Sequence, residues 1–149
     1  MSLDIRTLDE GALLDGICAG ELIDPIDIQR WRDTQGEAIA LGAYDEDRLV
    51  GVLLARTGTD GTICTALSAN SGGHATPYGL LLALADALPP DEVRHCRLSL
   101  RRADLTVRQA VETFGARPIR AGEGGGWQAA LSGERLQRCR TPVSRQRHS

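Results

Sequence analysis

The alternation of apolar and polar residues along the chain predicts a mixture of strands and helices. Residues 3–8 alternate as a first strand, and the acidic pair that opens residues 9–18 is typical of a helix start. Residues 25–32 form a second expected helix, with Asp24 as its N-cap and Pro25 as its first helical residue. One strand followed by two short helices is therefore the predicted opening of the fold.

The next segment predicts three neighbouring strands. Residues 37–56 contain two apolar runs broken by an acidic turn at residues 45–47, which is the pattern of a β-hairpin. A second turn at residues 57–61 leads into a β-branched strand at residues 62–68. We therefore expect an antiparallel meander.

A loop rich in glycine and small polar residues, residues 70–79, connects this meander to a largely apolar helix. Pro77 suits the first turn of that helix, and Pro89 ends it. Residues 94–100 then alternate with period two as a fifth strand, and a strand, loop, helix and strand in this order imply a parallel pair. The side chains of the fifth strand expected to face inward are Cys96, Leu98 and Leu100.

The C-terminal third predicts one more helix and a hairpin. Residues 104–114 place Val107, Ala110, Val111 and Phe114 at helical spacing. Two candidate strands, residues 117–120 and 127–131, flank a glycine-rich connection. We expect one domain over residues 1–132 and a basic, disordered tail over residues 133–149.

Composition narrows the possible functions. The chain has 149 residues, the size of one domain, and all of its 17 basic residues are arginine. The absence of lysine excludes P-loop, Schiff-base and Ser-x-x-Lys chemistry. Aromatic residues make up 3% of the chain, too few for a base-stacking surface, so specific nucleic-acid binding is not expected. No signal peptide or membrane-spanning segment is indicated, so we expect a cytoplasmic protein without a membrane partner.

Charge and cysteine placement add two further expectations. Residues 1–92 carry 5 Arg against 16 acidic residues, or −11, whereas residues 93–149 carry 12 Arg against 4, or +8, which together give the net charge of −3. Either the C-terminal half meets an anionic ligand or the two halves attract each other. The cysteines and histidines show no metal spacing, so buried, reduced thiols are expected and no metal site is predicted.

The glycine-rich loop is the best candidate for ligand binding. A strand that feeds a helix through such a loop presents free backbone amides and the positive helix end at one place, which favours a phosphate or pyrophosphate. The alternative is that the glycines serve only to turn the chain.

Two motifs and the order of elements resemble the GNAT superfamily of N-acetyltransferases over roughly residues 3–132. Residues 74–79, HATPYG, lie where that family has Arg/Gln-x-x-Gly-x-Gly/Ala. Residues 104–118, DLTVRQAVETFGARP, resemble its Asn-x-x-Ala-x-x-Leu-Tyr-Glu-x-x-Gly-Phe segment. The resemblance implies an α/β (α+β) fold, a single GNAT-like domain whose mixed, mostly antiparallel, V-shaped sheet has about seven strands flanked by about four helices.

The resemblance also implies acetyl-CoA as the acyl donor and an amine, on a small molecule or a peptide, as the acceptor. Coenzyme A would enter between the fourth and fifth strands. The implied cofactor-binding residues are Leu67, Ser68, Ala69, Gly72, Gly73, His74, Ala75, Thr76, Pro77, Tyr78, Gly79 and Asp104. The implied catalytic residues are Tyr44, Ser68 and Asn70. For Tyr44 a packing role is the alternative, and for Asp104 helix capping.

Three positions depart from the family pattern. His74 replaces the usual Arg or Gln, Pro77 replaces the first glycine and removes an amide donor, and Val111 stands where many members have a tyrosine acid. These departures leave a second hypothesis open, a catalytically silent GNAT-like binding or regulatory module. A monomer or a homodimer is expected.

Overall fold

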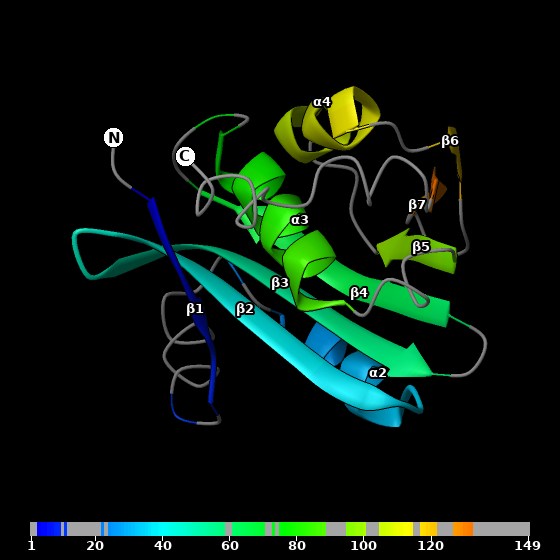
Figure 1. Cartoon of the computed structure of the whole chain (residues 1–149), viewed down its shortest axis with the longest axis horizontal. Coiled ribbons are helices and arrows are strands. Elements are labelled where there is room, and N and C mark those ends of the chain that lie inside the picture. Colours follow the sequence, from blue (N-terminus) through cyan, green and yellow to red (C-terminus); the bar gives the residue numbers. More distant parts are fainter. Residues whose placement is uncertain are drawn as a thin grey trace, which may run out of the picture.

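The computed structural model is built around one seven-stranded sheet in the order β1-β2-β3-β4-β5-β7-β6 (Figure 1). It describes residues 3–9, 11, 22, 24–58, 61–70, 73, 75–88, 95–100, 105–114, 117–121 and 127–132. The strands are β1 Leu3–Thr7, β2 Glu37–Asp45, β3 Arg48–Gly58, β4 Gly61–Ala69, β5 His95–Leu100, β6 Arg117–Ala121 and β7 Trp127–Ser132. The helices bounded within these residues are α2 Pro25–Asp33, α3 Ala75–Ala87 and α4 Leu105–Phe114.

Local sequence explains where the first of these elements begin and turn. The Asp24 carboxylate accepts a hydrogen bond of 2.9 Å from the amide of Ile26, so Asp24 caps α2 as predicted. Pro25 opens the helix because its missing N–H is not needed there. Between β2 and β3, Glu46 and Asp47 have φ values of 50° and 67°, the left-handed conformation that a two-residue hairpin turn requires.

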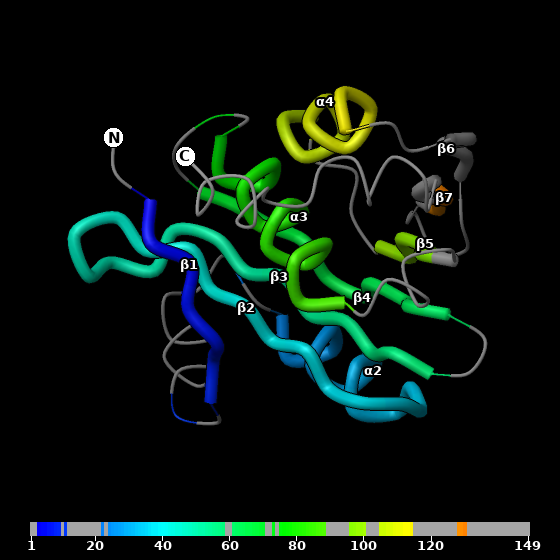
Figure 2. Tube along the Cα trace, viewed as in Figure 1, coloured from blue at the N-terminus to red at the C-terminus, as the bar shows by residue number. Residues whose placement is uncertain are grey.

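The strand pairing confirms the predicted meander and the predicted parallel pair. Strands β1 to β4 are antiparallel neighbours, and Figure 2 shows their path along the chain. Strand β5 pairs in parallel with β4, because α3 returns the chain to the end of the sheet at which β4 begins. The C-terminal hairpin adds β7, not β6, beside β5, so β6 becomes the edge strand. The predicted fold class, a single mixed and mostly antiparallel domain, is confirmed.

Two cores lie on opposite faces of the sheet. The larger core lies under α3 and α4, where Cys96, Leu98 and Leu100 of β5 point inward as predicted. The smaller core lies under α2, and Figure 1 shows that helix on the face away from α3 and α4. The four predicted helix positions of α4, Val107, Ala110, Val111 and Phe114, are all buried. The sheet is thus covered on both sides.

Some expectations fall on parts of the chain that the structure does not describe. Most of the helix expected over residues 9–18 and the whole tail over residues 133–149 lie outside the described residues, as do Cys18 and Cys139. Cys64 and Cys96 are free and buried, as expected. Among the described residues, no helix is long and apolar enough to cross a membrane.

Candidate functional site

Strands β4 and β5 separate partway along β4. They pair in parallel from Thr62 opposite Cys96 to Cys64 opposite Leu98, and no later pair is formed between the described parts of the two strands. Strand β4 nevertheless continues to Ala69, held on its other side by β3. The backbone of residues 65–69 therefore presents one edge to the opening between the strands.

A β-bulge marks the point of separation. Leu54 of β3 lies opposite Ala66, whereas the next β3 residue, Ala55, lies opposite Cys64, so Thr65 is an extra residue in β4. The Thr65 hydroxyl donates a hydrogen bond of 3.4 Å to the carbonyl of Leu54. The bulge shifts the alternation of the strand: Cys64 and Leu67 both face the core under α3 and α4, while Ala66 faces α2.

The first turn of α3 lies directly against the end of β4 and the facing part of β3. This close approach depends on Gly51 of β3, where a Cβ atom would lie 2.5 Å from Cγ2 of Thr76 and 3.3 Å from the carbonyl oxygen of Ser68. The first four backbone N–H groups of a helix lack intrahelical acceptors. In α3, Pro77 has no N–H group and so provides no donor there. No acidic residue lies in this first turn, so the positive end of the helix is available to an anion.

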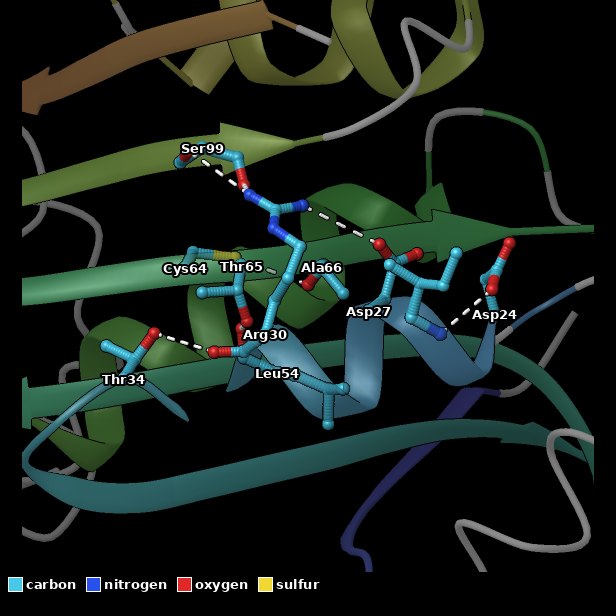
Figure 3. Close-up of polar contacts among 10 residues, drawn as sticks. Asp24, Asp27, Arg30, Thr34, Leu54, Cys64, Thr65, Ala66 and Ser99 are labelled. Atoms are coloured by element: carbon cyan, nitrogen blue, oxygen red, sulfur yellow. Dashed lines mark hydrogen bonds and ion pairs between the residues drawn. The ribbon is translucent and has the colours of Figure 1, made fainter. Parts of the chain in front are cut away.

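On the opposite face of the sheet, Arg30 connects α2 to β5. Its Nη2 atom donates to the carbonyl of Ser99 at 3.0 Å and lies 3.4 Å from the Ser99 hydroxyl, and Figure 3 shows the side chain reaching from the helix to the strand. Nη1 lies 3.6 Å from the carboxylate of Asp27 on the same helix. Ser99 directly follows Leu98, the last β5 residue paired with β4. Arg30 therefore ties α2 to the strand where the opening begins.

The end of β4 and the start of α3 bring together several of the predicted cofactor-binding residues. Leu67 is buried, and Ser68 and Ala69 are half-buried. The Ser68 hydroxyl donates to the carbonyl of Leu22, so it anchors the segment before α2. The amide of Asn70, a predicted catalytic residue, donates to the carbonyl of Val50 at 3.0 Å, while its side chain is exposed.

The predicted phosphate loop is described in part. Gly73 has a φ of +55° and Gly79 lies in the first turns of α3; a Cβ atom at either position would meet nothing within 4 Å. Ala75 is exposed, Thr76 and Pro77 are buried, and Gly79 is half-buried. Gly72, His74 and Asp104 lie outside the described residues, so their predicted roles stay predictions.

Both tyrosines pack against neighbours. Tyr44, a predicted catalytic residue, lies on β2, separated from β4 by β3, and the Arg6 guanidinium lies 4.5 Å from its ring centroid. Tyr78 packs edge-on against Phe114 of α4, with 5.3 Å between ring centroids. Val111, which the sequence resemblance aligns with the family's tyrosine, is fully buried in the core under α3 and α4.

The titratable groups near the sheet centre are neutral thiols. Burial raises the pKa of Cys64 strongly and that of Cys96 to about 12, so neither is a thiolate at neutral pH. Among the described residues, no cluster of His, Cys, Asp and Glu is arranged to hold a metal ion. The described part of the site therefore offers backbone donors, hydroxyls and arginine, but no thiolate.

Two functional positions were not singled out from the sequence. Gly51 interrupts an apolar strand in the sequence. An isolated glycine inside a strand often marks a place where another segment approaches the backbone closely, so the sequence did carry an indication of this contact. Arg30 lies 69 residues from Ser99, and nothing in the helical pattern of residues 25–32 indicates that partner.

Comparisons with known proteins agree with this geometry. No protein-family model matches the sequence, and no curated protein matches it. Solved structures do match: an N-acetyltransferase, PaiA, from Thermoplasma acidophilum in complex with coenzyme A is 16% identical, with a TM-score of 0.63 over 89% of this chain and 99% of that one. The ribosomal-protein-S18-alanine N-acetyltransferase of Escherichia coli is 15% identical, with a TM-score of 0.64 over 87% and 93%.

A third match is an aminoglycoside 6'-acetyltransferase type Ii, 17% identical, with a TM-score of 0.57 over 87% of this chain and 97% of that one. The match extends over nearly the whole length of these structures. It includes the region in which β4 separates from β5 and α3 begins. The chain has the fold of the GNAT superfamily of N-acetyltransferases.

Proposed function

We propose that the chain is an N-acyltransferase that transfers an acetyl group from acetyl-CoA to an amine. The observation that carries this proposal is the meeting of two features: the unpaired edge of residues 65–69 on β4 ends directly at the first turn of α3. An extended amide chain fits a free strand edge, and a pyrophosphate fits a helix N-terminus. Coenzyme A carries both groups in one molecule.

The residues of the opening fit such a ligand. The N–H groups of Ala75 and its neighbours at the start of α3 would hold the pyrophosphate. The space beside Gly79 is open, since a Cβ there would meet nothing within 4 Å. The backbone of Leu67, Ser68 and Ala69 would pair with the pantetheine amides. When bound, acetyl-CoA supplies an acyl group activated as a thioester.

The chain's contribution to transfer is then positional. Backbone N–H groups on β4 would polarise the carbonyl of the acyl group, and the walls of the opening would orient the amine. The amine must reach the site neutral, and the described side chains on the unpaired part of β4 include no carboxylate to deprotonate it. Water held by the exposed Asn70 side chain is our proposal for that proton transfer, with Ser68 fixed through Leu22.

A negative charge placed at the start of α3, where the pyrophosphate is proposed to bind, tests this proposal. Gly79→Glu introduces a carboxylate at the start of α3 without a steric clash, because the space beyond Gly79 is open. We expect this variant to lose acetyl-CoA binding in calorimetry, since a carboxylate repels the pyrophosphate. Gly79→Gln is the matched neutral control and should bind. Equal affinity of both variants, or no binding by the unaltered protein at millimolar acetyl-CoA, contradicts the proposal.

A catalytically silent binding module is the second candidate. It is supported by the buried Val111, which the sequence resemblance aligns with the family's tyrosine, and by the packing of Tyr78 against Phe114. Binding of acetyl-CoA without turnover across a panel of amines favours this candidate, and turnover of any amine above the uncatalysed rate removes it.

A further inference from the structure

A cavity of about 230 Å³ lies where β4, β5 and β7 run side by side. A whole drug-sized ligand needs roughly 300 Å³ or more, so this cavity holds a small ligand or one end of a larger one. Its lining consists of Ile63, Arg97, Leu98, Ser99, Gln128, Ala129 and Ala130.

Strand register explains how the polar lining residues come together. Arg97 lies opposite Ile63 of β4 on one side and Ala130 of β7 on the other, and Ser99 lies opposite Gln128. Because Cys96 and Leu98 point into the core under α3 and α4, alternation puts Arg97 and Ser99 on the face that α2 covers. The cavity therefore opens on the α2 face, with small apolar residues beside three polar side chains.

The charge of the lining selects one class of ligand. The polar side chains are one guanidinium, one hydroxyl and one carboxamide, and the described residues of the lining include no carboxylate. The Arg97 side chain is exposed and forms no ion pair with the described residues. A planar guanidinium beside a carboxamide donor binds a carboxylate well, whereas an amine with several positive charges finds no partner here.

The cavity adjoins the opening between β4 and β5. Ser99 lines the cavity and is also the residue whose carbonyl and hydroxyl Arg30 holds, at 3.0 and 3.4 Å. It follows directly on Leu98, the last residue in register with β4. A molecule anchored in the cavity therefore extends toward the unpaired edge of residues 65–69, where the acyl donor is proposed to bind.

We propose that this cavity binds the carboxylate of the acceptor, so that the acceptor is an amine that also carries a carboxylate, with Arg97 and Gln128 as its binding residues. The assignment rests on the proposed acyl transfer for the role of the amine. The transfer forms a bond from the amine nitrogen to the acyl carbon and breaks the thioester bond, and the amine's proton leaves with the thiol. The carboxylate itself is not altered.

The binding experiment uses the protein without acetyl-CoA. We would follow the backbone amides of Ser99 and Ala130 by NMR during titration with the N-acetyl derivatives of L-alanine, β-alanine and 4-aminobutyrate, and with the matching carboxamides. At least one carboxylate should bind, and its carboxamide should bind about tenfold more weakly, because a hydrogen bond to a charged group is lost. Arg97→Gln and Gln128→Glu should each remove that difference, while Arg48→Gln, at the start of β3, should leave it unchanged.

Turnover of the three free amino acids and their carboxamides with acetyl-CoA completes the test. Acetylation that prefers the carboxylates in the unaltered protein but not in Arg97→Gln supports both proposals. Carboxylate binding that depends on Arg97, with no acetylation of any amine, supports the cavity and contradicts the proposed function. Equal binding of carboxylates and carboxamides, or a preference that survives Arg97→Gln, overturns the cavity assignment even if amines are acetylated.

Discussion

Gly51 determines how closely α3 approaches the sheet, and replacing it with alanine tests the geometry of the site. A methyl group there would lie 2.5 Å from Thr76 Cγ2, 3.1 Å from Leu80 Cδ1 and 3.3 Å from the Ser68 carbonyl oxygen. Both side chains are fully buried, so neither can turn toward solvent. The first turn of α3 must therefore move away from β3 and from the end of β4.

The magnitude follows from two opposing effects. Overpacking a filled core costs about 1–3 kcal/mol, and replacing a strand glycine by alanine returns about 0.5–1 kcal/mol of backbone entropy. We expect Gly51→Ala to lower the free energy of unfolding by about 1–2 kcal/mol, which corresponds to a fall in Tm of about 3–8 °C. Because the displaced turn carries the proposed phosphate donors, acetyl-CoA affinity should fall by about tenfold.

Urea unfolding and calorimetry measure these two changes, and the chain offers matched controls. Gly58→Ala alters the same strand where a Cβ would meet nothing within 4 Å, so it should leave acetyl-CoA affinity nearly unchanged and raise the free energy of unfolding by up to about 1 kcal/mol. Thr76→Ser removes the clashing methyl group, so the double variant Gly51→Ala with Thr76→Ser should recover most of the loss. The reasoning is refuted if Gly51→Ala is no less stable than Gly58→Ala, or if Thr76→Ser gives no recovery.

Two further predictions concern stability. Arg30→Met removes the hydrogen bonds to Ser99 and should lower the free energy of unfolding by about 1–2 kcal/mol in urea titration; an unchanged midpoint contradicts the assigned link. The thiols of Cys64 and Cys96 should resist iodoacetamide in the folded protein at pH 8, and modification at the rate of an unfolded control contradicts their burial. Because burial raises their pKa values above the ordinary 9.0, that of Cys96 to about 12, the unfolded chain loses these protons first. Stability should therefore fall as pH rises from about 9 towards 12, and Cys64→Ala with Cys96→Ala should flatten that fall.

Sequence patterns predicted the elements because each was encoded locally. Asp24 and Pro25 mark the start of α2, and alternation over residues 37–56 marks the β2–β3 hairpin. The place of β7 between β5 and β6 was not predicted, because both orders of the final hairpin have the same alternation. Helix starts and hairpin turns can thus be predicted from the local sequence. Which strand of the final hairpin lies beside β5 cannot.

The candidate site was predictable only where it is continuous along the chain. The end of β4 and the start of α3 are joined by one short loop, so their meeting followed from the order of elements. The link from Arg30 to Ser99 and the cavity beside it depend on four elements, α2, β4, β5 and β7, and on strand register. Tyr44 was predicted at the end of the second strand, and only the structure shows its ring against Arg6.

The bulge at Thr65 has a consequence for how this chain can change over time. Thr65 takes up one position of β4 that has no partner on β3, so Cys64 and Ala66 point to opposite faces although they are two residues apart. Deleting Thr65 would leave a regular strand in which Leu67 still faces the core under α3 and α4 and Ala66 still faces α2. Straightening the strand with Thr65 retained would instead turn Leu67 toward α2. Descendants of this sequence can therefore lose the residue at the bulge without exchanging the two faces of β4.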